Sequence, residues 1–345
     1  MADRELPTDW RRWVLGARVR TLPAAIAPVL VGTTAAAGYC SEVGADTTPV
    51  DALDRALRCA SISAAPLWGE PQLAAFQGGA GGALKGLHLW TFLCALGVAV
   101  FVQIATNYAN DYADGRRGTD APGQRVGPPR LVGSGLATPG EVKRAMLVAF
   151  GLTALCGLPL VLFLDPWLLL VGLAAIAAGW FYTGGSRPYG YAGYGELFVF
   201  VFFGLVATVG SFYVQTLSIS WLAVGAGVAM GCLATALLVV NNLRDIPGDT
   251  RAGKTTLAVR LGDRRTRLLY VALVVVPMVL VPFIAGLSGR LLGALALVAL
   301  LPARRPVTAV LGGARGAGLI PVLADTGRVQ MVYGVLLAVG LFVSA

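Results

Sequence analysis

Two short stretches of the chain carry acidic and amide side chains directly after long apolar runs. The first reads Asn-Tyr-Ala-Asn-Asp-Tyr-Ala-Asp-Gly-Arg-Arg-Gly-Thr-Asp over residues 107–120, and the second reads Asn-Asn-Leu-Arg-Asp-Ile-Pro-Gly-Asp over residues 241–249. Both contain the pattern Asn-x-x-x-Asp, which places the two side chains on one face of a helix. Carboxylates at the edge of an apolar segment are costly without partners, so both stretches predict a functional site.

The side chains in these stretches suit a divalent cation bound through oxygen. Asp and Asn supply oxygen ligands, which Mg²⁺ prefers, and Mg²⁺ commonly bridges protein carboxylates to substrate phosphates. Clustered carboxylates would otherwise repel one another. The candidate Mg²⁺ ligands are Asp114, Asp120, Asp245 and Asp249. The side chains expected to position these ligands or a phosphate group are Asn110 and Asn241, with Asn107, Asp111 and Asn242 as second choices.

Glycine and proline residues indicate bends beside the acidic side chains. Two glycines loosen the end of the first stretch, so we expect Asp120 to reach back from a loop. Pro247 and Gly248 argue against a regular helix in the second stretch, so we expect Asp249 on a bend.

Cationic and aromatic side chains near both stretches complete a predicted diphosphate site. Guanidinium and ammonium groups hold the outer oxygens of phosphates, and the candidates here are Arg130, Lys254 and Arg260. An apolar protein around a diphosphate suggests a hydrocarbon chain, activated by metal-assisted departure of pyrophosphate in a water-poor pocket. In that chemistry Asp114 and Asp245 act through the metal, and Tyr182 stabilises an allylic cation or orients an aromatic acceptor.

The composition is that of a polytopic membrane protein. Of the 345 residues, 56% are hydrophobic and 13% are charged, whereas soluble domains carry about 25% charged residues. The net charge of +9 is explained by cationic loops and requires no nucleic acid.

The one histidine, His88, argues against a histidine-based metal site or catalytic triad. Cys40 and Cys59 flank a long loop and could pair in an oxidising compartment, a question that their spacing leaves open.

Long apolar runs predict an all-α transmembrane bundle in a single domain over residues 1–345. A membrane span needs about 20 apolar residues. Nine runs are expected to span, at 21–39, 88–109, 145–164, 166–183, 195–215, 219–241, 267–286, 290–303 and 328–345. The eighth is cut short by Pro302 and Arg304. The acidic stretches follow the second and the sixth span, which indicates two four-helix halves plus one added helix.

The distribution of Lys and Arg predicts the orientation of the protein in the membrane. Only four of the 27, namely Arg55, Arg58, Lys85 and Arg290, fall on one side of the predicted spans. Because cytoplasmic loops are enriched in Lys and Arg, we expect the N-terminus and both acidic stretches on the cytoplasmic side of the plasma membrane. Residues 40–87 then form an extracytoplasmic insertion, for which disorder is one expectation.

At these residues the chain resembles the UbiA-type intramembrane prenyltransferase superfamily. The first matching signature is Asn110-x-x-x-Asp114-x-x-x-x-x-Asp120. The second is Asn241-Asn242-x-Arg244-Asp245-x-x-x-Asp249, followed by Ala252-Gly253-Lys254 and by Thr-Leu-Ala-Val-Arg-Leu-Gly over 256–262. Residues 20–32, 182–197 and 319–323 also resemble the branch that acts on 1,4-dihydroxy-2-naphthoate in menaquinone biosynthesis.

The resemblance implies a nine-helix bundle that binds Mg²⁺ through both aspartate clusters. It further implies transfer of a polyprenyl chain from polyprenyl diphosphate to 1,4-dihydroxy-2-naphthoate, with loss of CO₂, to give demethylmenaquinone. The expected partners are therefore these two substrates and the lipid bilayer. The chain departs from the family pattern at Val19, where proline is common, and in the long insertion at 40–87.

Two alternatives remain open on the residues alone. A sister prenyltransferase would use another acceptor, such as 4-hydroxybenzoate, homogentisate or haem, or a phosphoribosyl donor. A transporter would use the carboxylates to carry cations. Transporter sites lie near the middle of the bilayer, whereas both acidic stretches are predicted at the cytoplasmic ends of their spans.

Overall fold

The computed structural model describes residues 10–39, 57, 86–118 and 129–345, and all regular structure in these ranges is helical. Nearly all of the predicted insertion at 40–87, with Cys40 and Cys59, lies outside the described residues. The predicted ligand Asp120 also lies outside them.

The described residues form fifteen helical elements in chain order. They are α1 (Arg11–Ala17), η1 (Val19–Thr21), α2 (Pro23–Ala35), α5 (Leu89–Arg117), α6 (Pro139–Phe163), α7 (Leu168–Phe181), α8 (Gly195–Val199), η3 (Phe200–Val206), α9 (Ala207–Thr216), α10 (Trp221–Arg251), α11 (Leu257–Leu287), η4 (Leu291–Ala299), α12 (Leu300–Leu311), η5 (Gly316–Gly318) and α13 (Leu319–Val343). The segments α8, η3 and α9 are continuous, as are η4 and α12.

The predicted polytopic, all-helical class is confirmed within the described residues, but the count of nine spans is not. Seven helical segments are long and apolar enough to cross a membrane. The pair Arg11–Thr21 and Pro23–Ala35, bent by 53°, would make an eighth. The remaining candidate, α7, has only 14 residues. A 14-residue helix is about 21 Å long, shorter than the hydrocarbon core of a typical bilayer.

Two predicted interruptions are wrong, because the helices continue through them. Helix α10 passes Pro247 and Gly248 and ends at Arg251, so Asp249 lies on a helix rather than on a bend. The helix that contains Pro302 likewise continues to Leu311. Pro247 removes only one backbone donor from the helix. The turn that contains it is held by the Thr250 hydroxyl, which donates to the Ile246 carbonyl at 2.8 Å, and by the Arg251 guanidinium, which donates to the Pro247 carbonyl at 3.1 Å.

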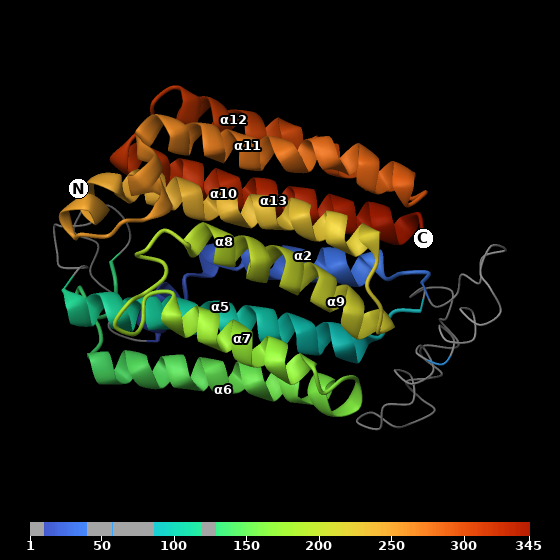
Figure 1. Cartoon of the computed structure of the whole chain (residues 1–345), viewed down its shortest axis with the longest axis horizontal. Coiled ribbons are helices and arrows are strands. Elements are labelled where there is room, and N and C mark those ends of the chain that lie inside the picture. Colours follow the sequence, from blue (N-terminus) through green and yellow to red (C-terminus); the bar gives the residue numbers. More distant parts are fainter. Residues whose placement is uncertain (1–9, 40–56, 58–85, 119–128) are drawn as a thin grey trace.

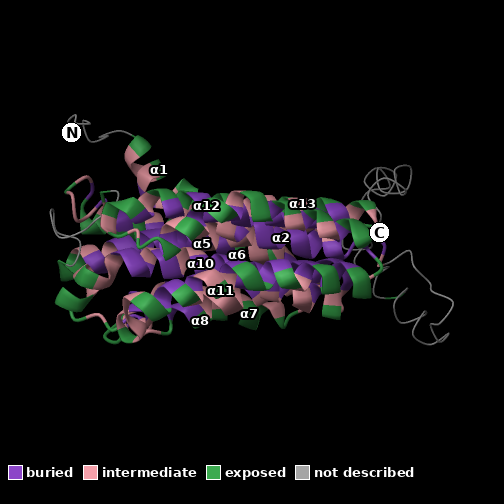
Figure 2. Ribbon diagram, turned by 90° about the horizontal axis from the view of Figure 1, so that it is seen from above, coloured by how far each residue is buried: buried purple, intermediate pink, exposed green. Residues whose placement is uncertain are grey.

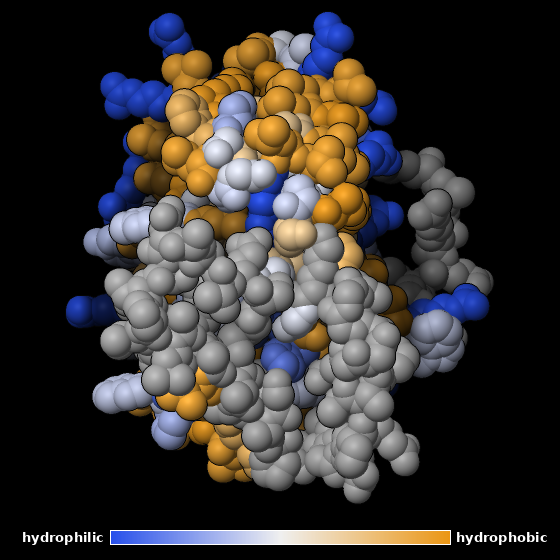
Figure 3. All heavy atoms as spheres, turned by 90° about the vertical axis from the view of Figure 1, so that its right-hand side faces the viewer, coloured by the Kyte–Doolittle hydropathy of each residue, from blue (hydrophilic) through white to orange (hydrophobic). Residues whose placement is uncertain are grey.

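The helices lie roughly parallel in a bundle, with α2, α10 and α13 between two outer groups (Figure 1). Helices α11 and α12 form one outer group, and α5, α6 and α7 form the other. Buried residues concentrate along α2 and α10 (Figure 2). Outward-facing leucines such as Leu155 and Leu162 on α6 are more than half exposed, as expected where helices face lipid. At the end of the bundle shown in Figure 3, hydrophobic residues cover much of the visible described surface.

Glycines bring η3 and α10 into close contact. A Cβ atom added at Gly204 would lie 2.3 Å from Cα of Gly231, so no larger residue fits at Gly204 while the two helices keep this spacing. Small residues at such crossings are typical of membrane helices, which associate through close packing. The contact holds the middle of the α8–α9 segment directly against α10.

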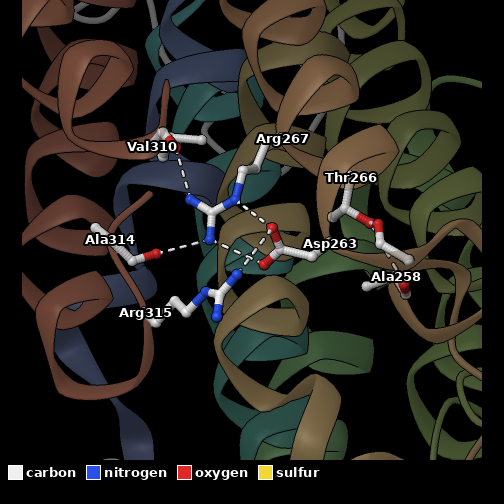
Figure 4. Close-up of polar contacts among 8 residues, drawn as sticks. Ala258, Asp263, Thr266, Arg267, Val310, Ala314 and Arg315 are labelled. Carbon is white, nitrogen blue, oxygen red and sulfur yellow. Dashed lines mark hydrogen bonds and ion pairs between the residues drawn. The ribbon is translucent and has the colours of Figure 1, made fainter. Parts of the chain in front are cut away.

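A buried arginine fastens the turn between α12 and α13 to α11 (Figure 4). The guanidinium of Arg267 donates to the carbonyl oxygens of Val310 at 2.6 Å and Ala314 at 2.9 Å. It also pairs with the Asp263 carboxylate at 2.7 Å. Arg315 approaches the same carboxylate at 3.9 Å but is 79% exposed. Arg267 therefore links α11 to the end of α12 and to the turn that leads to α13. Arg315 contributes little to this link.

We predict that Arg267→Lys destabilises the protein by about 2 kcal/mol, because one ammonium group cannot reproduce the fork that reaches two carbonyl groups and a carboxylate. Arg315→Lys is the matched control and should change stability by less than about 0.5 kcal/mol. Thermal unfolding of both variants in detergent measures the difference. Equal melting temperatures would contradict the role given to Arg267.

Candidate functional site

A cavity of about 1550 Å³ extends along the bundle and contains both acidic stretches at one end. Its lining reaches from Asp114 back to Ala95 on α5, a separation of 19 residues, or about 28 Å of helix. The ends of α5 and α10 meet the connection 182–194 at the left of Figure 1. Toward the other end the lining is apolar and includes Leu160, Leu168 and Val214. The cavity is thus polar at one end and apolar toward the other.

Asp114 of the first stretch is held by residues that come from two other segments. The Tyr191 hydroxyl donates a hydrogen bond to its carboxylate. The Lys254 ammonium lies 3.6 Å from the same carboxylate and 4.3 Å from the centre of the Tyr191 ring. Asp114 and Lys254 are largely buried, with 9% and 13% of their side chains exposed. The first stretch is thereby connected to the residues that follow the second.

Arg244 holds the acidic and amide groups of the second stretch. Its guanidinium donates to both carboxylate oxygens of Asp245, at 2.7 and 2.6 Å, and to the Asn241 amide oxygen at 2.8 Å. The Arg244 side chain is only 2% exposed. The sequence signature contains Arg244, but the predicted site residues did not. Its position next to Asp245 in the motif was the available signal.

The connection 182–194 joins the two stretches across the polar end of the cavity. Thr183 donates to the Asn110 amide oxygen at 2.8 Å. The Arg117 guanidinium donates to the backbone carbonyl groups of Thr183 and, at 2.6 Å, Gly185. The Thr255 backbone N–H donates to the Tyr191 carbonyl at 2.9 Å. Thr183, Arg117 and Tyr191 were not among the predicted site residues. The available signals were the place of Arg117 in the first acidic stretch and of Thr183 and Tyr191 in the stretch 182–197 that carries the family resemblance.

Two second-choice residues contact neighbouring helices. The Asn107 amide donates to the Ala17 carbonyl at 2.9 Å and to the Thr21 hydroxyl at 3.1 Å, which ties α5 to the bend between α1 and α2. The Asn242 amide donates to the buried Glu196 carboxylate at 2.9 Å. Both asparagines also line the cavity.

The third second-choice residue, Asp111, contacts the loop before α6. Its carboxylate accepts the backbone N–H groups of Leu131 at 2.9 Å and Val132 at 3.0 Å. Asp111 is only 1% exposed. The residue preceding this pair is Arg130, which lines the cavity.

Aromatic rings line the cavity next to its polar end. The Tyr189 ring stacks on Phe198 with centroids 4.0 Å apart and meets the Tyr182 ring edge-on at 5.5 Å. Phe202 continues the stack, 6.1 Å from Phe198. Burial raises the pKa of Tyr189, so its phenol stays neutral. Tyr182 therefore belongs to an aromatic wall, whose ring faces can stabilise a positive charge.

The predicted diphosphate contacts fall into two groups. Arg130 and Lys254 line the cavity. Arg260 is exposed, and its guanidinium donates to the Thr255 carbonyl at 3.1 Å; it is not among the residues that line the cavity. The structure therefore separates Arg260 from the other two cations.

The oxygen donors at the polar end fit Mg²⁺. Asp114, Asp245 and Asp249 line the same cavity, together with Asn110 and Asn241. Within the described ranges, no three His, Cys, Asp or Glu side chains lie close enough together to form a metal site by themselves. The donor set still suits Mg²⁺ bound with a diphosphate, because Mg²⁺ commonly takes one or two protein carboxylates with phosphate and water oxygens.

Curated relatives resemble the chain over nearly its full length. It is 46% identical over 330 residues to a 1,4-dihydroxy-2-naphthoate octaprenyltransferase of Mycobacterium tuberculosis, covering 96% of each chain. It is 43% identical over 331 residues to the protein of that name from Mycobacterium leprae, again covering 96% of each chain.

Solved structures share the fold at low sequence identity. A UbiA homologue from Aeropyrum pernix has a TM-score of 0.56 and 16% identity, over 73% of this chain and 90% of that one. A UbiA homologue from Archaeoglobus fulgidus bound to DMAPP and Mg²⁺ has a TM-score of 0.52 and 14% identity, over 94% and 99% of the two chains.

The family comparison matches residues 72–313 to the UbiA prenyltransferase family. This range covers more than half of the chain and includes both acidic stretches and the connection 182–194. The M. tuberculosis relative extends the similarity to nearly the whole sequence. The chain therefore belongs to the UbiA prenyltransferase family.

Proposed function

We propose that this protein transfers a polyprenyl chain from polyprenyl diphosphate to 1,4-dihydroxy-2-naphthoate in the synthesis of demethylmenaquinone. The observation that carries the proposal is the division of one cavity into an end with acids and cations and a long apolar remainder. This division matches a substrate with a diphosphate head and a hydrocarbon tail. The names of the two mycobacterial relatives support the naphthoate acceptor and a polyprenyl donor.

The proposed reaction exchanges one carbon–oxygen bond and one carbon–carbon bond for a new carbon–carbon bond. The allylic carbon–oxygen bond breaks, and diphosphate leaves with the electron pair. The ring carbon that bears the carboxylate attacks the allylic carbon. The bond to the carboxylate then breaks, CO₂ leaves, and its electron pair restores the aromatic ring. The step itself needs no oxidant or reductant, and its immediate product is the hydroquinone form, a 2-prenyl-1,4-dihydroxynaphthalene. Formation of the quinone, demethylmenaquinone, takes a separate two-electron oxidation.

The residues at the polar end have separate tasks in this reaction. Bound Mg²⁺ supplies the positive charge that stabilises the departing diphosphate. Asp114, Asp245 and Asp249, with Asp120, would hold the metal. Lys254 would hold the outer phosphate oxygens as a hydrogen-bond donor.

The aromatic and apolar walls have a different task. Tyr182 and Tyr189 border the polar end, where the allylic carbon of a bound substrate would lie. Their ring faces favour a nearby cation. The apolar lining excludes water, which would otherwise capture the allylic cation and give a prenyl alcohol.

The orientation in the membrane follows from the charge distribution. With all but four of the 27 Lys and Arg on the side of the acidic stretches, we place the polar end at the cytoplasmic face of the plasma membrane. A sister reaction with another aromatic acceptor is the remaining alternative. Membership of a prenyltransferase family removes the support for a transporter.

We predict that membranes containing the protein convert 1,4-dihydroxy-2-naphthoate and a polyprenyl diphosphate to a prenylated product that has lost CO₂. Mass spectrometry of the product identifies it directly. Parallel reactions with 4-hydroxybenzoate and homogentisate should give little product, and EDTA should stop the reaction until Mg²⁺ is restored. Preferential use of 4-hydroxybenzoate would shift the assignment to the sister reaction.

Asp245→Ala should lower turnover by about 10²–10³-fold, because it removes a metal ligand whose charge acts in the transition state. The matched control is Asp165→Asn, at the opposite end of the bundle, where the carboxylate accepts a hydrogen bond from Trp167 N–H at 2.9 Å. The control should retain near wild-type turnover. Near wild-type turnover of Asp245→Ala, at equal protein levels in membranes, would rule out the metal role.

Lys254→Gln should raise the KM for polyprenyl diphosphate about tenfold or more, since it removes a buried cation from the polar end. Arg260→Gln should change KM much less, because Arg260 is exposed and does not line the cavity. Steady-state kinetics over a range of diphosphate concentrations compares them. If the two variants raised KM equally, the position of Lys254 in the cavity lining would not make it a better substrate contact than Arg260.

A further inference from the structure

We infer that the two neighbouring acids of the first stretch have different tasks, and that Asp111 is a positioning residue that holds Arg130 at the diphosphate end of the cavity. The inference rests on the proposed function, because Arg130 matters only if a diphosphate binds there. Asp111 and Asp114 look alike in the sequence, where Asp114 is a candidate metal ligand and Asp111 a second choice among the residues expected to position the ligands or a phosphate. Their contacts separate them.

The Asp111 carboxylate is occupied by a backbone segment far away in the sequence. One oxygen accepts the Leu131 N–H at 2.9 Å, and the other accepts the Val132 N–H at 3.0 Å. Because only 1% of the residue is exposed, these two N–H groups take the place of water as hydrogen-bond donors to the carboxylate. Charge-assisted bonds to two consecutive N–H groups fix both the position and the direction of the backbone.

The same face of α5 shapes the packing of this segment. Gly115 lies four residues after Asp111, on the same face of the helix. A Cβ atom at Gly115 would lie 2.4 Å from the Cβ of Val132, so the loop rests directly on the helix backbone. Leu131 is fully buried beside it. Asp111 and Gly115 therefore form one site, called here the seat, against which residues 131 and 132 of the loop pack.

The seated loop presents Arg130 to the cavity. Arg130 immediately precedes the two N–H groups that Asp111 holds, and its carbonyl accepts the Ser134 N–H at 2.9 Å. The backbone on the C-terminal side of Arg130 is therefore fixed at successive positions, and its side chain lines the cavity. Displacement of the loop would move this cation relative to a bound diphosphate.

Asp114 has different partners from Asp111. It meets the Lys254 ammonium and the Tyr191 hydroxyl, which belong to the polar end of the cavity itself. A group with this environment can exchange partners with a metal and a phosphate. A metal ion could reach Asp111 in the same way only by competing with two buried backbone donors.

The test compares Asp111→Asn with Asp114→Asn. In Asp111→Asn, the amide can accept only one of the two N–H groups, and its own NH₂ opposes the other. We expect the KM for polyprenyl diphosphate to rise about tenfold, with kcat and the half-saturating Mg²⁺ concentration nearly unchanged. Asp114→Asn should instead raise the Mg²⁺ requirement and lower kcat.

A second variant tests the seat without touching an acid. Gly115→Ala should push Val132 outward and raise the same KM, and Val132→Gly added to Gly115→Ala should restore it, because glycine lacks the Cβ and Cγ1 atoms that the new methyl group would meet at 2.4 Å. The rescue excludes a general loss of folding. Failure of Gly115→Ala to raise KM, or of the double variant to recover it, would contradict the seat.

A double-mutant cycle connects Asp111 to Arg130. Because Asp111 acts through Arg130, Asp111→Asn should add little to the effect of Arg130→Gln. Full additivity, or a raised Mg²⁺ requirement in Asp111→Asn, would overturn the inference. Equilibrium binding of geranylgeranyl S-thiolodiphosphate should weaken in Asp111→Asn as KM rises. If the wild-type protein prenylates no acceptor, the proposed function fails, while this binding comparison still decides the role of Asp111.

Discussion

Carboxylates at the ends of apolar helices must be matched by cations or hydrogen-bond donors, and the polar end of this protein is organised around that requirement. An unmatched buried charge costs several kcal/mol, on the order of the whole margin of stability of many proteins. Asp114 meets Lys254 and Tyr191, and Asp245 meets Arg244. Apart from Arg244, which adjoins Asp245, these partners come from segments far from the acids that they serve. Matching the charges therefore joins the ends of α5 and α10 to the connection 182–194.

The remainder of the cavity has the opposite character, and the contrast gives the protein its chemistry. The cavity follows α5 for about 28 Å from its charged end, and the aromatic rings of Tyr182, Tyr189 and Phe198 stand between that end and the apolar lining. A bound polyprenyl diphosphate would have its reacting carbon beside these rings. Charge stabilisation and exclusion of water are thus supplied by neighbouring walls of one cavity.

The sequence predicts the helices and the two acidic stretches because long apolar runs and repeated Asn-x-x-x-Asp patterns are local signals. The sequence does not predict several features that become visible only in the folded protein. Pro247 suggests a break, yet α10 continues through it to Arg251, and the side chains of Thr250 and Arg251 donate to backbone carbonyl groups of that turn. Asp111 and Asp114 share one motif, and only the fold shows that the former meets a backbone segment 20 residues away. The role of Tyr191, in the connection 182–194, was not predicted. Its contacts depend on tertiary structure rather than on the spacing of residues in the sequence.

The central claim is that both acidic stretches bind one metal–diphosphate unit. The most direct test is pulsed electron paramagnetic resonance of the protein with Mn²⁺ in place of Mg²⁺ and inorganic diphosphate added. The account predicts a bound Mn²⁺ with hyperfine coupling to ³¹P, and loss of that signal when either Asp114 or Asp245 is replaced by alanine. Tightly bound Mn²⁺ without ³¹P coupling, or a signal that survives both substitutions, would contradict it.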